Sequence, residues 1–331
     1  MAAAAALRQT AMTSAGVGVA AGCLGTWFEM SHGVICIPVV NLPPLSLAPQ
    51  VAIGSTVFGV AARQVLSAGL LSLDPNVDLS RDLEEMIDVP AATGLALAGT
   101  GAALSGAGLV RYVSQRKLRR ATGAFLVGVA AFLQWREAEA KKAKEARMNA
   151  RAPVAAEADS SSAPPVARPL GAPSVPPLEM GASESRFEWP RYVTLGMASG
   201  FVLGFFGVGP AWMLAPLISK TAAGSKSGAQ LAAELGDEDD EVLGSVFGSD
   251  ERIRRTCGVA MVPPCLAASW RHWRLGHVPN MGAIALPMAA GAVLGSVGAG
   301  QLLEGVPVES DMRFGLAVLI FAYGAWSMVK P

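Results

Sequence analysis

The sequence contains few charged residues and few aromatic ones. Asp, Glu, Lys and Arg together make up 16% of the 331 residues, whereas an average soluble domain is about one quarter charged. Aromatic residues make up 6%, although hydrophobic residues as a whole reach 52%. The scarcity of charge argues against a soluble enzyme, a nucleic-acid-binding protein and a disordered chain. It is typical of closely packed membrane helices.

Neither an excess of one charge nor a catalytic motif is present. The 26 Lys and Arg residues balance the 26 Asp and Glu residues, so net charge indicates no nucleic acid or other polyanionic partner. Without a Walker sequence, an ATP-driven pump is disfavoured. The four cysteines lie in apolar segments without metal-ligand spacing, so we expect small buried side chains and no metal: Cys23, Cys36, Cys257 and Cys265. We expect neither enzymatic activity nor a cofactor.

Long apolar runs dominate the chain. A run of about 20 such residues can cross roughly 30 Å of hydrocarbon, and eight segments approach or exceed this length. They are residues 14–40, 49–73, 89–110 and 121–135 in the first half, and 192–219, 256–270, 281–303 and 314–329 in the second. The sequence therefore predicts an all-α, polytopic integral membrane protein with two repeats of four segments, in a membrane that it does not identify.

The remaining residues divide the chain into further parts. Residues 1–13 read as an N-terminal tail, with a signal or transit peptide as the alternative. Repeats at 14–136 and 191–331 flank residues 137–190, which are charged and then rich in Pro, Ala and Ser, and which we expect to form a flexible linker. A polar loop at 220–255 carries an acidic cluster.

The two halves align with each other. An offset of 178 residues matches four Gly, Phe and Pro positions: Gly18 with Gly196, Gly22 with Gly200, Phe28 with Phe206, and Pro38 with Pro216. An offset of 197 residues matches Pro90 with Pro287 and Gly94 with Gly291. Internal symmetry of this kind is common in secondary transporters.

The loop charges indicate a topology. Loops around 111–120 and 271–277 are basic and contain no acid, whereas loops around 74–88 and 304–311 are acidic. If every segment crossed once, the two basic loops would lie on opposite faces. If 14–40 and 192–219 are broken or re-entrant, both basic loops share the cytoplasmic face, as membrane proteins prefer, and the repeats are inverted. The basic residues from Arg136 to Arg151 oppose this scheme.

Two helix breaks at corresponding positions are the strongest indication of a site. Residues 28–38 and 206–216 each contain Gly and Pro, and a break exposes a helix N-terminus that attracts anions. We therefore expect Gly33, Gly207, Gly209 and Pro210 to line a site for a small anionic substrate. Close helix packing is the alternative role for these residues.

A few polar side chains inside the apolar runs are further candidates. Glu29 and His32 could couple protons or gate the path; alternatively Glu29 is hydrated near the interface and His32 bonds a backbone carbonyl. Arg63, Ser55 and Thr56 could bind the substrate. Their alternatives are a snorkelling arginine and hydroxyls bonded to their own helix.

The second half resembles the sulfite exporter TauE/SafE family. The resemblance lies in residues 196–200, 204–210 and 214–217, in the basic turn 270–278, and in the Gly-rich segment 286–300. It implies a membrane transporter that exports small anions such as sulfite, sulfonates or related organosulfur acids, without covalent chemistry. Gly209-Pro210-Ala211 and the stretch 29–33 depart from the family pattern.

The sequence implies a small anionic substrate and membrane lipid as binding partners, and it is compatible with a homo-oligomer. The competing function is a non-transporting membrane scaffold or receptor. Such a protein would dock its partners through the acidic loop at 220–255 and the linker at 137–190.

Overall fold

The computed structural model describes residues 2–28, 30–73, 86–160, 189–209, 214, 252–303, 306 and 310–329, and the regular secondary structure in these residues is helical. The elements, in chain order, are α1 (Ala2–Trp27), α2 (His32–Val40), α3 (Pro49–Leu73), α5 (Val89–Val110), α6 (Gln115–Ser160), α7 (Trp189–Phe206), α11 (Val262–Arg274), the π-helical turn η1 (Met281–Ala285), α12 (Leu286–Leu302) and α13 (Ser310–Val329). Residues 252–260 form a further helical stretch before α11. The all-α class is confirmed.

Four helices are long and apolar enough to cross a membrane. These candidate spans are Pro49–Gly69, Val89–Val110, Met281–Leu302 and Asp311–Val329. At 1.5 Å per residue they measure about 29–33 Å, the thickness of a hydrocarbon core. Large apolar side chains such as Leu97 and Leu319, each 68% exposed, point away from the bundle. These features indicate a multi-pass membrane protein.

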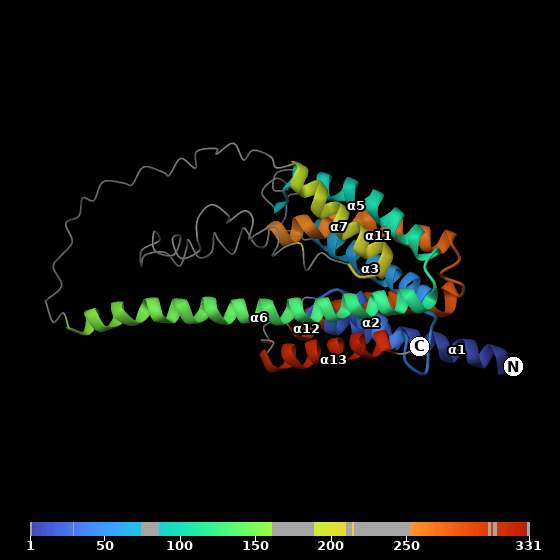
Figure 1. The fold of residues 1–331 in the computed structure, drawn as a ribbon, viewed down its shortest axis with the longest axis horizontal. Coiled ribbons are helices and arrows are strands. Elements are labelled where there is room, and N and C mark those ends of the chain that lie inside the picture. Colours follow the sequence, from blue (N-terminus) through green and yellow to red (C-terminus); the bar gives the residue numbers. More distant parts are fainter. Residues whose placement is uncertain are drawn as a thin grey trace.

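The helices pack in pairs that join the two halves of the chain. α1 packs along α12, α7 along α5, and α6 along α13, while α3 and α11 contact each other. Figure 1 shows α5, α7 and α11 as one group and α6, α12 and α13 as another. At the closest pairs the backbones touch, because a Cβ on Gly18 would overlap the Met288 carbonyl, and a Cβ on Gly200 would overlap that of Gly99. Glycine permits this close approach.

Both basic loops lie at the end of the bundle where α3 begins. The side chain of Gln50 donates hydrogen bonds to the carbonyl oxygens of Val110 and Val113, at the end of α5. Gly54 packs against His277, in the turn after α11. Because both contacts are made by the first turns of α3, the two basic loops lie at the same end of the bundle, which we call the basic end.

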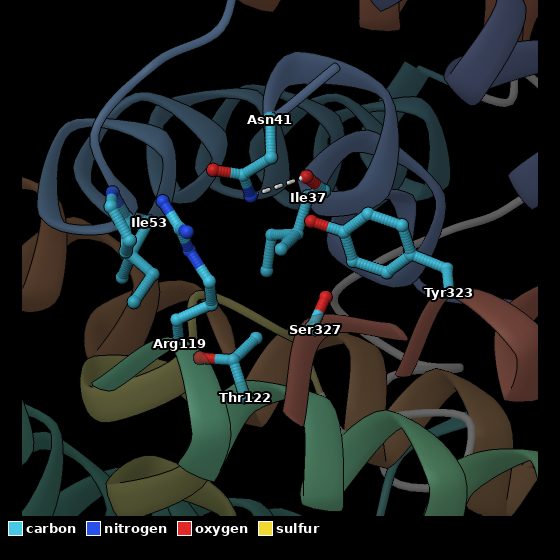
Figure 2. Close-up of a pocket in the computed structure, with 8 residues that line it drawn as sticks. Ile37, Asn41, Ile53, Arg119, Thr122, Tyr323 and Ser327 are labelled. Carbon is cyan, nitrogen blue, oxygen red and sulfur yellow. Dashed lines mark hydrogen bonds between the residues drawn. The ribbon is translucent and has the colours of Figure 1, made fainter. Parts of the chain in front are cut away.

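This common end fixes the direction of each helix. α1 runs parallel to α12, since Gly18 meets Met288 and Gly22 meets Ala292, so both run away from the basic end. α2 returns toward it, because Asn41 at the end of α2 lines a hollow with Arg119 at the start of α6 (Figure 2). The first apolar run thus contains two helices of opposite direction, α1 ending at Trp27 and α2 beginning at His32.

The structure adds helical residues to two of the expected parts. The expected tail at 1–13 is helical from Ala2, and its exposed first turns project from the basic end in Figure 1. The expected linker at 137–190 continues as helix α6 to Ser160, because Ala, Glu, Lys and Arg in this stretch are strong helix formers. At 46 residues, α6 is about 69 Å long, and Figure 1 shows it running past the bundle.

Several of the predicted features lie outside the described residues. The rest of the expected linker, at 161–188, and almost all of the acidic loop at 220–255 lie there. So do Glu29 and Pro210.

Candidate functional site

The two helix breaks meet inside the bundle. The backbone N–H of Gly209, in the second break, donates a hydrogen bond of 2.9 Å to Ser31 Oγ in the first. Ser31 is also the N-cap of α2, because its Oγ accepts a bond from the N–H of Gly33. Gly33 in turn lies against the carbonyl of Gly207, where a Cβ would overlap it. Gly33, Gly207 and Gly209, three of the predicted site residues, are thus brought together.

Helix α3 shows how deep this meeting point lies. Gly207 packs against Ile53 and Thr56, and Gly209 packs against Val60. These α3 residues follow Pro49 by about 6–17 Å at 1.5 Å per residue. Because the candidate span on α3 begins at Pro49, the breaks lie beside the first half of this span, which would be inside the apolar layer of a membrane that α3 crosses. Non-helical backbone is tolerated at such depth only where protein or a water-filled cavity surrounds it.

Local backbone chemistry explains why α7 stops where it does. Gly207 adopts φ +71°, a conformation that glycine reaches without strain and that interrupts a right-handed helix. Its N–H still closes onto the Leu203 carbonyl. The carbonyls of the last turn are then left without partners within the helix.

Arg63 supplies partners for the carbonyls at the first break. Its Nη1 donates to the Met30 oxygen at 2.8 Å, and its Nη2 donates to the Gly25 oxygen at 3.3 Å. A cation at a helix C-terminus also complements the negative end of the helix dipole. Arg63 therefore holds the end of α1 against α3, and the snorkelling alternative does not apply. Glu29, the acidic candidate at this break, lies outside the described residues.

His272 has a comparable role at the second break. Its Nε2 lies 2.8 Å from the Gly204 carbonyl in the last turn of α7, so this nitrogen carries the donated proton. His272 Nδ1 must then accept from His277 Nδ1, which is 3.0 Å away. Burial lowers the pKa of His277. Sequence reasoning missed this pair, although both histidines lie in the basic turn 270–278 that carries the family resemblance.

The remaining predicted residues differ in their surroundings. Thr56 Oγ1 donates to the Ile53 carbonyl of its own helix, which was the alternative role for it. His32 is buried against Gly59, with its Nε2 3.0 Å from Cys36 Sγ. Ser55 Oγ is buried and has no hydrogen-bond partner in the described structure, so it keeps its hydrogen-bonding capacity.

The four cysteines are free thiols, of which Cys36, Cys257 and Cys265 are buried as expected, whereas Cys23 is partly exposed. In the part of the chain that the structure describes, no three His, Cys, Asp or Glu side chains gather as metal ligands.

Comparison with known proteins yields no relative for this chain. No family model matches it, and neither a curated protein nor a solved structure matches it. The resemblance to sulfite exporters therefore rests on the quoted motifs alone, and the geometry of the two helix breaks is the main structural indication of function.

Proposed function

We propose that the protein is a secondary transporter of small anions. The observation that carries this proposal is the contact between two helix breaks inside the apolar layer, made by Ser31 with Gly209 and by Gly33 with Gly207. Paired breaks at corresponding positions of two halves are typical of transporter binding sites. Interrupted backbone at that depth is tolerated where protein or a water-filled cavity surrounds it, as at a transporter's binding site.

Helix directions support an arrangement of two inverted repeats. In the proposed correspondence α1, α3, α5 and α6 match α7, α11, α12 and α13. The first member of each pair runs opposite to the second relative to the basic end, as the contacts of Gln50, Gly54, Gly196 and Gly200 indicate. Packing is reciprocal as well, because α1 pairs with α12 while α7 pairs with α5. Inverted repeats allow one half to rock against the other around a fixed site.

The chemistry around the breaks favours an anion. α2 begins at the meeting point, so its N-terminal N–H groups and positive dipole end face the site. Ser31 adds a hydroxyl, and Arg63 adds a positive charge about one helical turn beyond Val60. The sequence motifs then narrow the proposed substrates to sulfite, sulfonates or related organosulfur acids.

Flux into proteoliposomes tests the proposal. The wild-type chain should move radiolabelled sulfite or a sulfonate down an imposed gradient, while empty liposomes should not. Ser31→Ala removes the hydroxyl that joins the breaks and should slow flux about tenfold, the effect of one hydrogen bond. Ser105→Ala is the matched control, since Ser105 Oγ bonds the carbonyl of Gly101 on an exposed helix face.

A wild-type protein that moves none of a panel of inorganic and organic anions would refute the proposal. In that case the scaffold or receptor function becomes the better explanation. Equal flux in Ser31→Ala and Ser105→Ala would instead remove the break contact from the transport path.

A further inference from the structure

One face of α11 is apolar for most of its length and basic at its end. Leu266, Trp270 and Trp273 are 51%, 50% and 52% exposed, and their spacing of four and then three residues places them on one side of the helix. Arg274 follows in the last turn, with its guanidinium carbon 5.8 Å from the centroid of the Trp270 ring. The opposite side packs into the bundle through its buried residues, which are Pro264, Cys265, Ala268, Ser269 and His272.

The end of α5 adds two further arginines to this surface. α5 and α11 run side by side in the same direction, since Gly99 packs against Pro264 and a Cβ on Gly108 would lie 3.8 Å from Arg271 Nη2 (Figure 1). Arg111 follows Gly108 by three residues and therefore lies on the same side of α5. Three guanidinium groups thus belong to the adjacent ends of two parallel helices: Arg111, Arg271 and Arg274.

These positive charges have no acidic partner in the part of the chain that the structure describes. Arg271 and Arg274 form no ion pair there, and Arg111 lies over the ring of Tyr112, with 4.3 Å between its guanidinium carbon and the ring centroid. Both loops that carry them, 111–120 and 271–277, lack Asp and Glu. Because a guanidinium has five N–H donors, the cluster keeps donors for an external anion.

The order of side chains along the two helices matches the layers of a bilayer. From Leu266 to Trp273 the helix rises about 10 Å toward the basic end, and Arg274 comes next. Leucine favours hydrocarbon, tryptophan favours the membrane interface, and arginine extends its charge to the headgroups. α5 repeats this order with Leu109 and Tyr112, which are 44% and 70% exposed. A soluble partner would not require such layering, so the surface favours a lipid.

We propose that the adjacent ends of α5 and α11 form a binding site for one anionic phospholipid. Its phosphodiester accepts hydrogen bonds from Arg271, whose planar guanidinium matches two phosphate oxygens, while Arg111 and Arg274 add positive charge. Its acyl chains lie along Leu266 and Trp270.

The net negative charge of the lipid is what the site selects. In phosphatidylcholine the choline cation compensates the phosphate, whereas phosphatidylglycerol leaves it uncompensated. Anionic lipids are concentrated in the cytoplasmic leaflet, the side on which membrane proteins prefer their basic loops. The site lies on the outer surface of the bundle, apart from the helix breaks, and neither the site nor its test depends on transport.

Quenching of tryptophan fluorescence by brominated lipid tests the proposal. The purified full-length chain is reconstituted in phosphatidylcholine vesicles, and increasing fractions of phosphatidylglycerol or phosphatidylcholine with brominated acyl chains are introduced. Brominated phosphatidylglycerol should quench a first fraction of the fluorescence at an at least tenfold lower content than brominated phosphatidylcholine. The double variant Trp270→Phe and Trp273→Phe lacks the two reporters beside the site and should lose this first phase.

Charge variants locate the effect. Arg271→Gln and Arg274→Gln should each lower the preference for phosphatidylglycerol about fivefold, equivalent to about 1 kcal/mol for each arginine near an anionic surface. Arg271→Lys keeps the charge and should retain more of the preference than Arg271→Gln. The matched controls are Arg116→Gln and Arg120→Gln, which remove the same charge from exposed positions at the start of α6, in the other group of helices. Both should keep the wild-type preference.

Four outcomes would overturn the proposal. Equal quenching of the wild type by the two brominated lipids means that no site for an anionic lipid exists. Equal losses in Arg271→Gln and Arg120→Gln would assign the preference to the whole basic end. A first phase that persists in the double tryptophan variant places the lipid elsewhere. If inorganic phosphate at constant ionic strength abolishes the first phase, the ligand is a free anion rather than a lipid.

Discussion

Single glycines on α5 should respond to a methyl group in opposite ways, depending on what lies beside them. A Cβ on Gly106 would lie 2.8 Å from the carbonyl oxygen of Phe201 and 3.0 Å from the nitrogen of Phe205, both on α7. At Gly101, five residues earlier on the same helix, a Cβ would meet nothing within 4 Å. The two substitutions therefore add the same methyl group to the same helix in different surroundings.

The expected magnitudes follow from these distances. Gly106→Ala must push backbone atoms of α7 away by several tenths of an ångström, and overpacking of this kind costs about 1–3 kcal/mol. Gly101→Ala has no such cost and gains about 0.5–1 kcal/mol from the better helix propensity of alanine. Gly200→Ala should cost more than Gly106→Ala, because its Cβ would overlap the Gly99 carbonyl outright.

Thermal unfolding in detergent measures this ranking, with about 2–4 °C of Tm expected for each kcal/mol. The Tm should rise slightly in Gly101→Ala, fall in Gly106→Ala and fall furthest in Gly200→Ala. Equal Tm values for Gly101→Ala and Gly200→Ala would refute the backbone contact between α5 and α7. The parallel register of the two helices would then be wrong as well.

Three further predictions concern the break, the histidine pair and the loops. Arg63→Met removes both hydrogen bonds to the Met30 and Gly25 carbonyls. It should lower the free energy of unfolding, measured with a denaturant, by about 3–6 kcal/mol, since each hydrogen bond to a charged group contributes about 1.5–3 kcal/mol. A loss below about 1 kcal/mol would contradict the proposed role of Arg63 in holding α1 against α3. Burial lowers the pKa of His277, so below about pH 6.5 the unfolded chain binds more protons and stability falls as the pH drops. His277→Gln should flatten this fall in a Tm series from pH 7.5 to pH 5, and an unchanged slope would exclude His277 as its source. Ser114→Cys, in the first basic loop, and Asn280→Cys, three residues after the second, should react with an impermeant maleimide from the same side of the membrane. Labelling from opposite sides would contradict the shared basic end.

The hydropathy of the sequence was enough to locate the long apolar helices, because a helix that can cross a membrane is defined by its own local composition. The boundaries expected for residues 49–73 and 89–110 coincide with α3 and α5. The interruptions near residues 28–31 and 207–209 could also be predicted from the sequence, since glycine and proline act on the backbone at their own positions. The extent of α6 could not be predicted. The composition of residues 137–190 as a whole is dominated by the proline, alanine and serine further along, and this concealed the helix-forming stretch at its start.

The role of each polar side chain depended on contacts between distant parts of the chain. The sequence placed Arg63 in an apolar run, but only the fold brings it to the carbonyls of Met30 and Gly25, more than thirty residues away. His272 and Gly204 are 68 residues apart, and Ser31 and Gly209 are 178 apart. No local pattern encodes such pairs.

The sequence by itself determined that this chain is helical, apolar and interrupted at two places, because those properties follow from residues acting within one turn of helix. The tertiary structure decided that the two interruptions face each other and that Arg63 and His272 satisfy the carbonyls freed beside them. It also decided that Arg271 of α11 lies beside Gly108 at the end of α5. A buried polar group must find a partner wherever the packing provides one, and that packing is set by the register of helices from both halves of the chain.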